Sequence, residues 1–282
     1  MTNFLNEQYY ILGVKMDVIT REILLEKIDK AVENKKNLVI FTPYSEYIYR
    51  AQIEETFKNV LNAADLSTAD GVFIQIASIY YESVKKTRSQ VINYFKLLGL
   101  CIRMVTKHID RGIVFPELLS GSAEVQSIAE NAELMGHSVY LVGGAQNVVY
   151  VAAQKLKQKY PTLNIVGTQV GTAYSADDKY LFEDISVKKP DVLMVCYGSQ
   201  KEERWVIEFK EKIHAKVIIG LGGTFDYVSE KRKLQSQWWS DHGLNWLHRL
   251  ISEPVRWRRQ IIIFRLLWIL AGVTENKNDN LI

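Results

Sequence analysis

The sequence has few of the features that assign a function at sight. It contains two cysteines, Cys101 and Cys196, which lie in apolar surroundings without CxxC spacing. We therefore expect two free, buried thiols in a reducing compartment and no disulfide framework. The five histidines form no HExxH motif or other ligand-spaced pair, and the chain has no DxD, GxSxG or GxxxxGK[ST] motif. These absences predict that the protein has no metal site and needs no cofactor.

Long hydrophobic runs and an excess of one charge are missing as well. The longest late apolar run, residues 261–273, is shorter than the ~20 residues that span a bilayer, and it contains Arg265. The N-terminus has no basic segment followed by an apolar core, so we expect no secretory signal. A formal net charge of +3 argues against a polyelectrolyte that binds nucleic acid. The chain is expected to act in the cytoplasm and to lie on a membrane without crossing it.

Basic and tryptophan residues are instead concentrated near the C-terminus. Five of the six tryptophans follow position 237, and residues 231–265 hold eight Lys or Arg against two acids. Such a segment suits an anionic membrane surface or a phosphorylated ligand. The eight basic residues are Lys231, Arg232, Lys233, Arg249, Arg256, Arg258, Arg259 and Arg265.

Short apolar runs alternate with helical patterns through most of the chain. Residues 37–43, 138–144 and 190–199 predict buried strands, and further strands are expected to end near residues 70, 171 and 222. Ser45 is a plausible N-cap for the first of the intervening helices. This alternation predicts an α/β fold whose parallel sheet is covered by helices on both faces. We expect a core over residues 1–230, with a helical insertion at about 76–116, and a C-terminal arm over 231–282.

Two glycine pairs and one carboxylate follow predicted strands. The pairs lie in LVGGAQ (141–146) and GLGGTF (220–225), where backbone N–H groups can face an anion, although tight turns use glycine for steric reasons too. The carboxylate is Asp70 in STADGV. It either caps a helix or acts as a base, because an isolated buried acid is costly.

Five blocks of the chain resemble the WecG/TagA/CpsF glycosyltransferases, in the order and near the spacing of that family. The blocks are TPYSEYIYRA…LNAADLSTADGVF, VYLVGGAQ…YPTLNIVGTQVG, PDVLMVCYGSQKEERWV, IGLGGTFDYVSEK and GLNWLHRLISEPVRWRR. They cover most of the chain outside residues 76–116.

The resemblance implies a Rossmann-like, inverting and metal-independent enzyme. It would move an N-acetylhexosamine-type sugar, N-acetylmannosamine or its uronic acid, from a UDP donor. The acceptor would be a polyprenyl-diphosphate-linked sugar in teichoic acid, common antigen or capsule assembly. The C-terminal arm would meet the anionic inner face of the cell membrane and complete the site. A homo-oligomer is left open.

The resemblance also carries roles to individual residues. Asp70 matches the family's general base, and Thr42 matches the Thr of its TxNPE block. The substrate-binding matches are Gly143, Gly144, Lys201, Glu203, Gly222, Gly223, Phe225, Asp226, Arg249, Arg256 and Arg259.

Several polar positions of the family differ in this chain. Tyr44 replaces the Asn of TxNPE and Glu202 replaces the Gln of PKQE, while Leu118 and Ala123 replace the Arg and Asp of RVxGxD. An alternative reading follows from these differences: a catalytically silent homologue that binds a nucleotide sugar or lipid-linked glycan and partners an active enzyme.

The family pattern does not explain the stretch near 76–116. Residues 91–105 are apolar around most of a helix circumference and are flanked by basic residues. We predict that this helix packs beside the active site and forms a lipid-facing surface with the arm; a subunit interface is the alternative.

Overall fold

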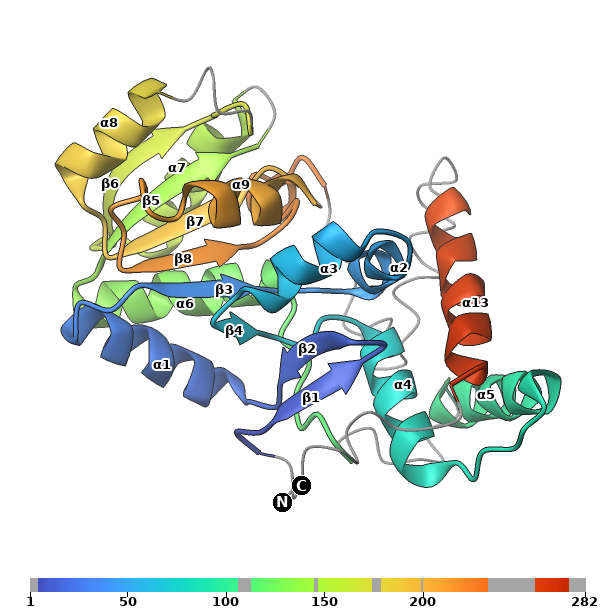
Figure 1. The fold of residues 1–282 in the computed structure, drawn as a ribbon. Coiled ribbons are helices and arrows are strands. Elements are labelled where there is room, and N and C mark those ends of the chain that lie inside the picture. The colour runs from blue at the N-terminus through green and yellow to red at the C-terminus, as the bar shows by residue number, and fades with distance from the viewer. Residues whose placement is uncertain are drawn as a thin grey trace.

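The computed structural model describes residues 5–105, 113–144, 147–173, 179–198, 200–232 and 257–273. A parallel sheet lies at its centre, with six strands in the order β4-β3-β8-β7-β5-β6 (Figure 1). The strands are β3 (Leu38–Phe41), β4 (Leu66–Ser67), β5 (Ser138–Gly143), β6 (Asn164–Gln169), β7 (Val192–Cys196) and β8 (Val217–Gly220). The predicted α/β fold, with a Rossmann-like sheet, is confirmed.

Helices cover both faces of the sheet because successive strand residues point to opposite sides. In β7, Leu193 and Val195 belong to one buried cluster, whereas Val192 and Met194 belong to the other. The first cluster contains α2 (Ser45–Ile53), α3 (Glu55–Asn62), α4 (Val72–Ser83), α8 (Lys179–Lys188) and α9 (Lys201–Phe209). The second contains α1 (Arg21–Glu33), α6 (Gly121–Met135), α7 (Val148–Lys159) and α10 (Phe225–Val228).

The connections reverse direction between β5 and β7. From β5 the chain crosses through α7 to β6 on one side, and from β7 it crosses through α9 to β8 on the other. Since α7 and α9 lie on opposite faces, the carboxyl ends of β5 and β7 form a topological switch point, where ligands of open α/β sheets bind.

A β-hairpin that our sequence analysis did not anticipate precedes this core. Strands β1 (Gln8–Ile11) and β2 (Val14–Asp17) pair antiparallel through Leu12 and Gly13, both at positive φ. The Asp17 carboxylate accepts the Ser67 N–H at 2.7 Å, which ties the hairpin to β4 at the edge of the sheet.

The first predicted helix needs a correction. It begins at Ser45, but its N-cap residue is Tyr44 and no side chain caps it. A single extended residue, Glu54, divides the predicted segment into α2 and α3.

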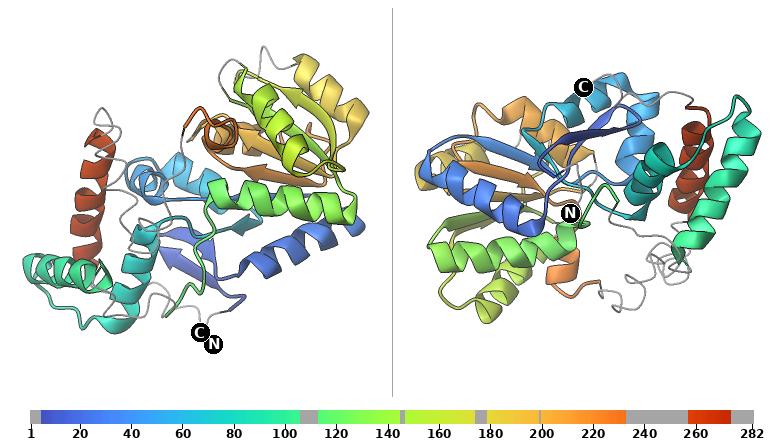
Figure 2. Two further views of the ribbon diagram at one scale, coloured as in Figure 1. Left: turned by 180° about the vertical axis from the view of Figure 1, so that it is seen from behind. Right: turned by 90° about the horizontal axis from the view of Figure 1, so that it is seen from below.

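Two helices stand apart from the sheet, beyond the carboxyl ends of its strands (Figures 1 and 2). Helix α5 (Gln90–Val105) lies within the predicted helical stretch, and α13 (Trp257–Ala271) lies within the C-terminal arm. They pack against each other, and α13 also contacts α2. Across the described ranges, none of the helices is both long and apolar enough for a bilayer span.

Candidate active site

The residues that follow five of the six strands lie along the carboxyl edge of the sheet. The strand order places the segments after β4, β3, β8, β7 and β5 next to one another. Hydrogen bonds join each segment to its neighbour, as described below. The two glycine pairs and the predicted base therefore belong to one continuous edge, although the sequence separates them widely.

Asp70 lies after β4, beside the segment that follows β3. The N–H of Thr68 donates to the Phe41 carbonyl at 2.9 Å, and that of Asp70 donates to the Pro43 carbonyl at 3.3 Å. Helix α4 starts immediately afterwards, with Gly71 at φ +92° as its N-cap and no side-chain cap. The capping position thus belongs to Gly71. Asp70 itself is half-buried at this edge of the sheet, where its carboxylate can contact a bound ligand.

Thr42 connects the end of β3 to the end of β8. It is 6% exposed, and its hydroxyl donates to the Gly220 carbonyl at 3.2 Å. This contact orients the turn that carries the second glycine pair. The structure thus gives Thr42 a positioning contact, and its predicted catalytic role stays a prediction.

Glu202 joins the turns that follow β7 and β8. Its side chain is buried, and its two carboxyl oxygens accept the Gly198 N–H at 3.2 Å and the Gly222 N–H at 2.5 Å. In the sequence, this residue stands out only as a departure from the family pattern. One signal in the sequence could have indicated a structural role for Glu202: it lies in the first turn of the helix that follows the buried strand β7.

Glu203 lies next to Glu202 and is completely buried. Burial raises the pKa of Glu203 to about 7, while the nearby Tyr47 hydroxyl opposes that shift. Burial and the adjacent Glu203 raise the pKa of Glu202 well above its ordinary value. Two carboxyl groups this close share protons as a pair. The predicted substrate-binding residue Glu203 thus lies in the core behind the glycine turns.

The Gly143–Gly144 pair packs tightly against β7. A Cβ on Gly143, which has φ +111°, would lie 2.4 Å from the Cys196 carbonyl oxygen. The N–H of Gly144 donates to that same oxygen at 2.8 Å. Close packing at the switch point is therefore sufficient to explain why glycine occupies these two positions. The Gly144 N–H is already engaged in this hydrogen bond with β7.

The Gly222–Gly223 pair leaves more room. Apart from the adjoining residues, no atom of the described part of the chain lies within 4 Å of a Cβ built on either glycine, which leaves room there for a ligand to approach the backbone. Beyond the pair, Phe225 is buried and the Asp226 carboxylate pairs with Arg232 at 3.3 Å. Phe225 thus supports the turn from the core.

The predicted cations are only partly described. Lys201 is exposed at the start of α9. Arg249 and Arg256 lie outside the described residues. The backbone of Arg259 belongs to α13, and its side chain is outside the description. Farther along α13, the Arg265 guanidinium donates to the Tyr49 hydroxyl at 3.0 Å.

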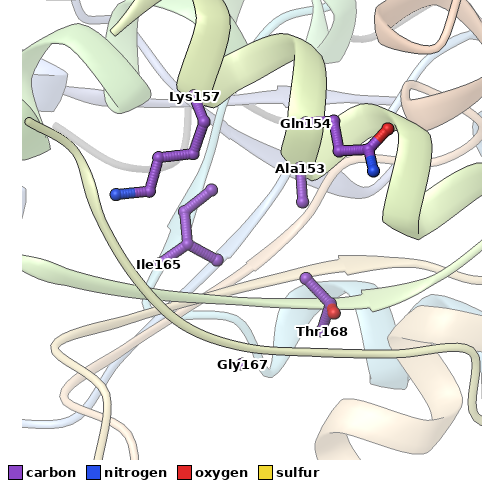
Figure 3. Close-up of a pocket in the computed structure, with 6 residues that line it drawn as sticks. All are labelled: Ala153, Gln154, Lys157, Ile165, Gly167 and Thr168. Carbon is purple, nitrogen blue, oxygen red and sulfur yellow. The ribbon is translucent and has the colours of Figure 1, made fainter. Parts of the chain in front are cut away.

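Other candidate sites carry less chemistry. The described part of the chain contains no group of three or more His, Cys, Asp or Glu arranged to hold a metal ion. A shallow hollow between α7 and β6 is lined by Ala153, Gln154, Lys157, Ile165, Gly167 and Thr168 (Figure 3). It has no carboxylate and lies away from the glycine turns. Both cysteines are free, and burial raises the pKa of Cys101 to about 11.

Comparisons with known proteins agree on one family. The sequence model of the Glycosyl transferase WecG/TagA/CpsF family matches residues 9–99 and 97–279. Two curated relatives are both named N-acetylglucosaminyldiphosphoundecaprenol N-acetyl-beta-D-mannosaminyltransferase. The relative from Bacillus spizizenii strain W23 is 25% identical over 214 residues, which is 74% of this chain and 82% of the relative. The relative from Bacillus subtilis strain 168 is 24% identical over 247 residues, which is 88% of this chain and 83% of the relative.

Proposed function

This chain belongs to the Glycosyl transferase WecG/TagA/CpsF family, and we propose that it transfers N-acetylmannosamine, or a closely related sugar, from UDP to a polyprenyl-diphosphate-linked sugar. The observation that carries the proposal is the position of Asp70 on the same sheet edge as both glycine turns. The two relatives are named for a transfer of this kind.

Asp70 is the proposed general base. The acceptor hydroxyl is a weak nucleophile at neutral pH, and a carboxylate that takes its proton promotes attack on the anomeric carbon of the donor. The new bond forms as the bond to UDP breaks from the opposite face, and UDP leaves with the bonding electrons. Because a diphosphate leaves as a stabilised anion, one base is sufficient and no second catalytic acid is needed.

The developing charge on UDP has to be met by N–H groups and cations. The backbone at Gly223 supports a diphosphate contact at this turn, while the neighbouring Gly222 N–H is held by Glu202. Lys201 is an exposed cation directly before Glu202. Arg249, Arg256 and Arg259 remain the proposed partners of the donor or acceptor diphosphate, since arginine grips such groups bidentately. Thr42 and Glu202 position the turn in this scheme.

We further propose that the protein works on the inner face of the cell membrane and that residues 231–282 form its membrane-associating arm. The lipid part of a polyprenyl acceptor stays in the bilayer, so the enzyme has to reach the headgroup from the surface. The described residues of the arm are basic and apolar, which supports this placement.

A transfer assay with purified protein tests the proposal. The reactants are UDP-N-acetylmannosamine and a short-chain polyprenyl diphosphate that carries N-acetylglucosamine. We expect a lipid-linked disaccharide, one released UDP per product, and a rate that EDTA leaves unchanged. The silent-homologue alternative predicts binding without product. It would be supported if UDP-GlcNAc, UDP-ManNAc, UDP-glucose and their uronic acids bind and none is transferred.

A further inference from the structure

Helix α5 has two apolar sides, and only one of them faces the protein. Leu97, Leu100 and Met104 are buried. On the opposite side Val91, Phe95 and Ile102 are 52%, 66% and 65% exposed, again at helical spacing. Core packing explains the buried stripe but not the exposed one. Large apolar side chains that are exposed in a contiguous group mark an interaction site.

Helix α13 continues the exposed stripe. Its Ile261, Phe264 and Trp268 are 38%, 51% and 45% exposed, while its other side is buried. The Trp268 ring meets the Tyr94 ring edge-on, with 5.5 Å between the ring centroids. The Gln90 side-chain amide also donates to the Trp268 carbonyl at 2.9 Å. The two stripes therefore form one surface, the α5–α13 face, which consists of Val91, Ile92, Phe95, Ile102, Ile261, Phe264 and Trp268.

One buried amide fixes the angle between the two helices. Asn93 is fully buried, and its side-chain nitrogen donates to the Thr87 carbonyl at 2.8 Å and to the Ala271 carbonyl at 3.1 Å. Its side-chain oxygen accepts the Thr87 N–H at 2.8 Å. This network holds the end of α13 against α5, so the exposed side chains are presented together without further ordering.

The charged residues of the two segments that carry the face are all of one sign. Residues 84–105 and α13 contain no Asp or Glu; their charged residues are Lys85, Lys86, Arg88, Lys96, Arg103, Arg258, Arg259 and Arg265. An apolar surface with aromatic residues and a cationic border fits the headgroup region of an anionic bilayer. A symmetric dimer through this face would instead bring the same cationic sets of two copies together, which is unfavourable.

We propose that the exposed apolar side of α5 joins α13 in docking the protein on an anionic lipid bilayer through the α5–α13 face. The inference deepens the proposed function and partly rests on it, because a lipid-linked acceptor requires such a surface. The two helices stand beyond the carboxyl ends of the strands, on the side of the candidate active site (Figure 1). Docking through this face brings that edge toward the membrane.

Vesicle co-sedimentation with two matched triple variants tests the inference. The face variant carries Val91→Ser, Phe95→Ser and Ile102→Ser. The control variant carries Val187→Ser, Leu134→Ser and Ile53→Ser, which are exposed apolar residues elsewhere on the surface. Vesicles contain phosphatidylcholine with or without phosphatidylglycerol. We expect the face variant to lose about tenfold or more in partitioning onto phosphatidylglycerol vesicles, and the control variant to bind as the wild type does.

Two further readouts separate the outcomes. Sedimentation velocity reports the oligomeric state, and transfer to a short-chain, water-soluble acceptor reports the active site apart from the membrane. Lost vesicle binding with unchanged sedimentation and unchanged soluble transfer supports the inference. Wild-type partitioning by the face variant would overturn it, as would a change from dimer to monomer with vesicle binding intact. Failure of soluble transfer by the wild-type protein would contradict the proposed function and leave the docking result to stand by itself.

Discussion

At the end of β7, one buried carboxyl group holds two backbone turns in place. Glu202 accepts N–H groups from Gly198, four residues before it, and from Gly222, twenty residues after it. The glutamine expected here from the family has one acceptor oxygen, whereas a carboxyl group has two. The sequence marked the substitution, but its consequence depends on which strand ends are neighbours, and that is a property of the folded sheet.

The neighbouring Glu203 makes stability depend on pH. Its folded-state pKa of about 7 is raised above the ordinary value of 4.5, so the protonated form is favoured by folding. Its contribution is fully present below pH 4.5 and is lost as the pH rises through about 7, so the free energy of unfolding falls over that range. Urea denaturation of wild type and Glu203→Gln at acidic and alkaline pH measures this loss.

We expect Glu203→Gln to gain stability relative to the wild type as the pH rises. The exposed Glu208 on the same helix provides the control, since Glu208→Gln should follow the wild-type profile. If the free energy of unfolding changed with pH in the same way for the wild type and Glu203→Gln, the assignment of a proton to this buried pair would be contradicted.

Gly143 and Gly198 offer a matched test of packing at the switch point. Both have positive φ, +111° and +93°. Among the described residues, a Cβ on Gly198 would meet no atom within 4 Å, whereas a Cβ on Gly143 would lie 2.4 Å from the Cys196 carbonyl oxygen. Gly198→Ala should cost about 1–2 kcal/mol from the left-handed conformation alone. Gly143→Ala should cost about 1–3 kcal/mol more, because the carbonyl has to move. Equal destabilisation in urea would show that packing does not require this glycine.

Among the elements, the buried parallel strands were the most predictable. Runs such as residues 38–41 and 192–196 are apolar at every position because helices cover both faces, and that pattern is visible without a structure. The β1–β2 hairpin was missed because Leu12 and Gly13 form its turn, and leucine is an uncommon residue at positive φ. The break at Glu54 was missed because neither proline nor glycine marks it.

The α5–α13 contact gives a prediction at the scale of elements. Asn93→Ala removes the amide that bridges Thr87 and Ala271, and unpaired buried groups cost about 1–3 kcal/mol. We expect α13 to lose protection in hydrogen exchange monitored by mass spectrometry. Asn62→Ala is the control, because Asn62 bonds to Lys15 and Gly13 of the hairpin and has no such link to α13. Unchanged α13 protection in Asn93→Ala would mean that other contacts hold the helix.

In the whole molecule, the candidate site exists only after the sheet is assembled. Thr42 and Gly220 are 178 residues apart in sequence and are joined by a hydrogen bond. Each strand end carries polar or glycine residues that look unremarkable separately, and motif spacing cannot show that β3 lies between β4 and β8. The family resemblance supplied the expected roles, whereas the sheet order shows which of those residues share one edge.

The central claim is that Asp70 is the base of a glycosyl transfer, and the turnover of Asp70→Asn tests it most directly. Asparagine keeps the size of the side chain but does not accept a proton at neutral pH. We predict that kcat falls by about a hundredfold or more while the Kd for UDP stays unchanged. Asp184→Asn on α8, next to the edge strand β6, is the matched control and should turn over at the wild-type rate. Turnover of Asp70→Asn within about threefold of wild type would contradict the account, because a general base contributes far more than that.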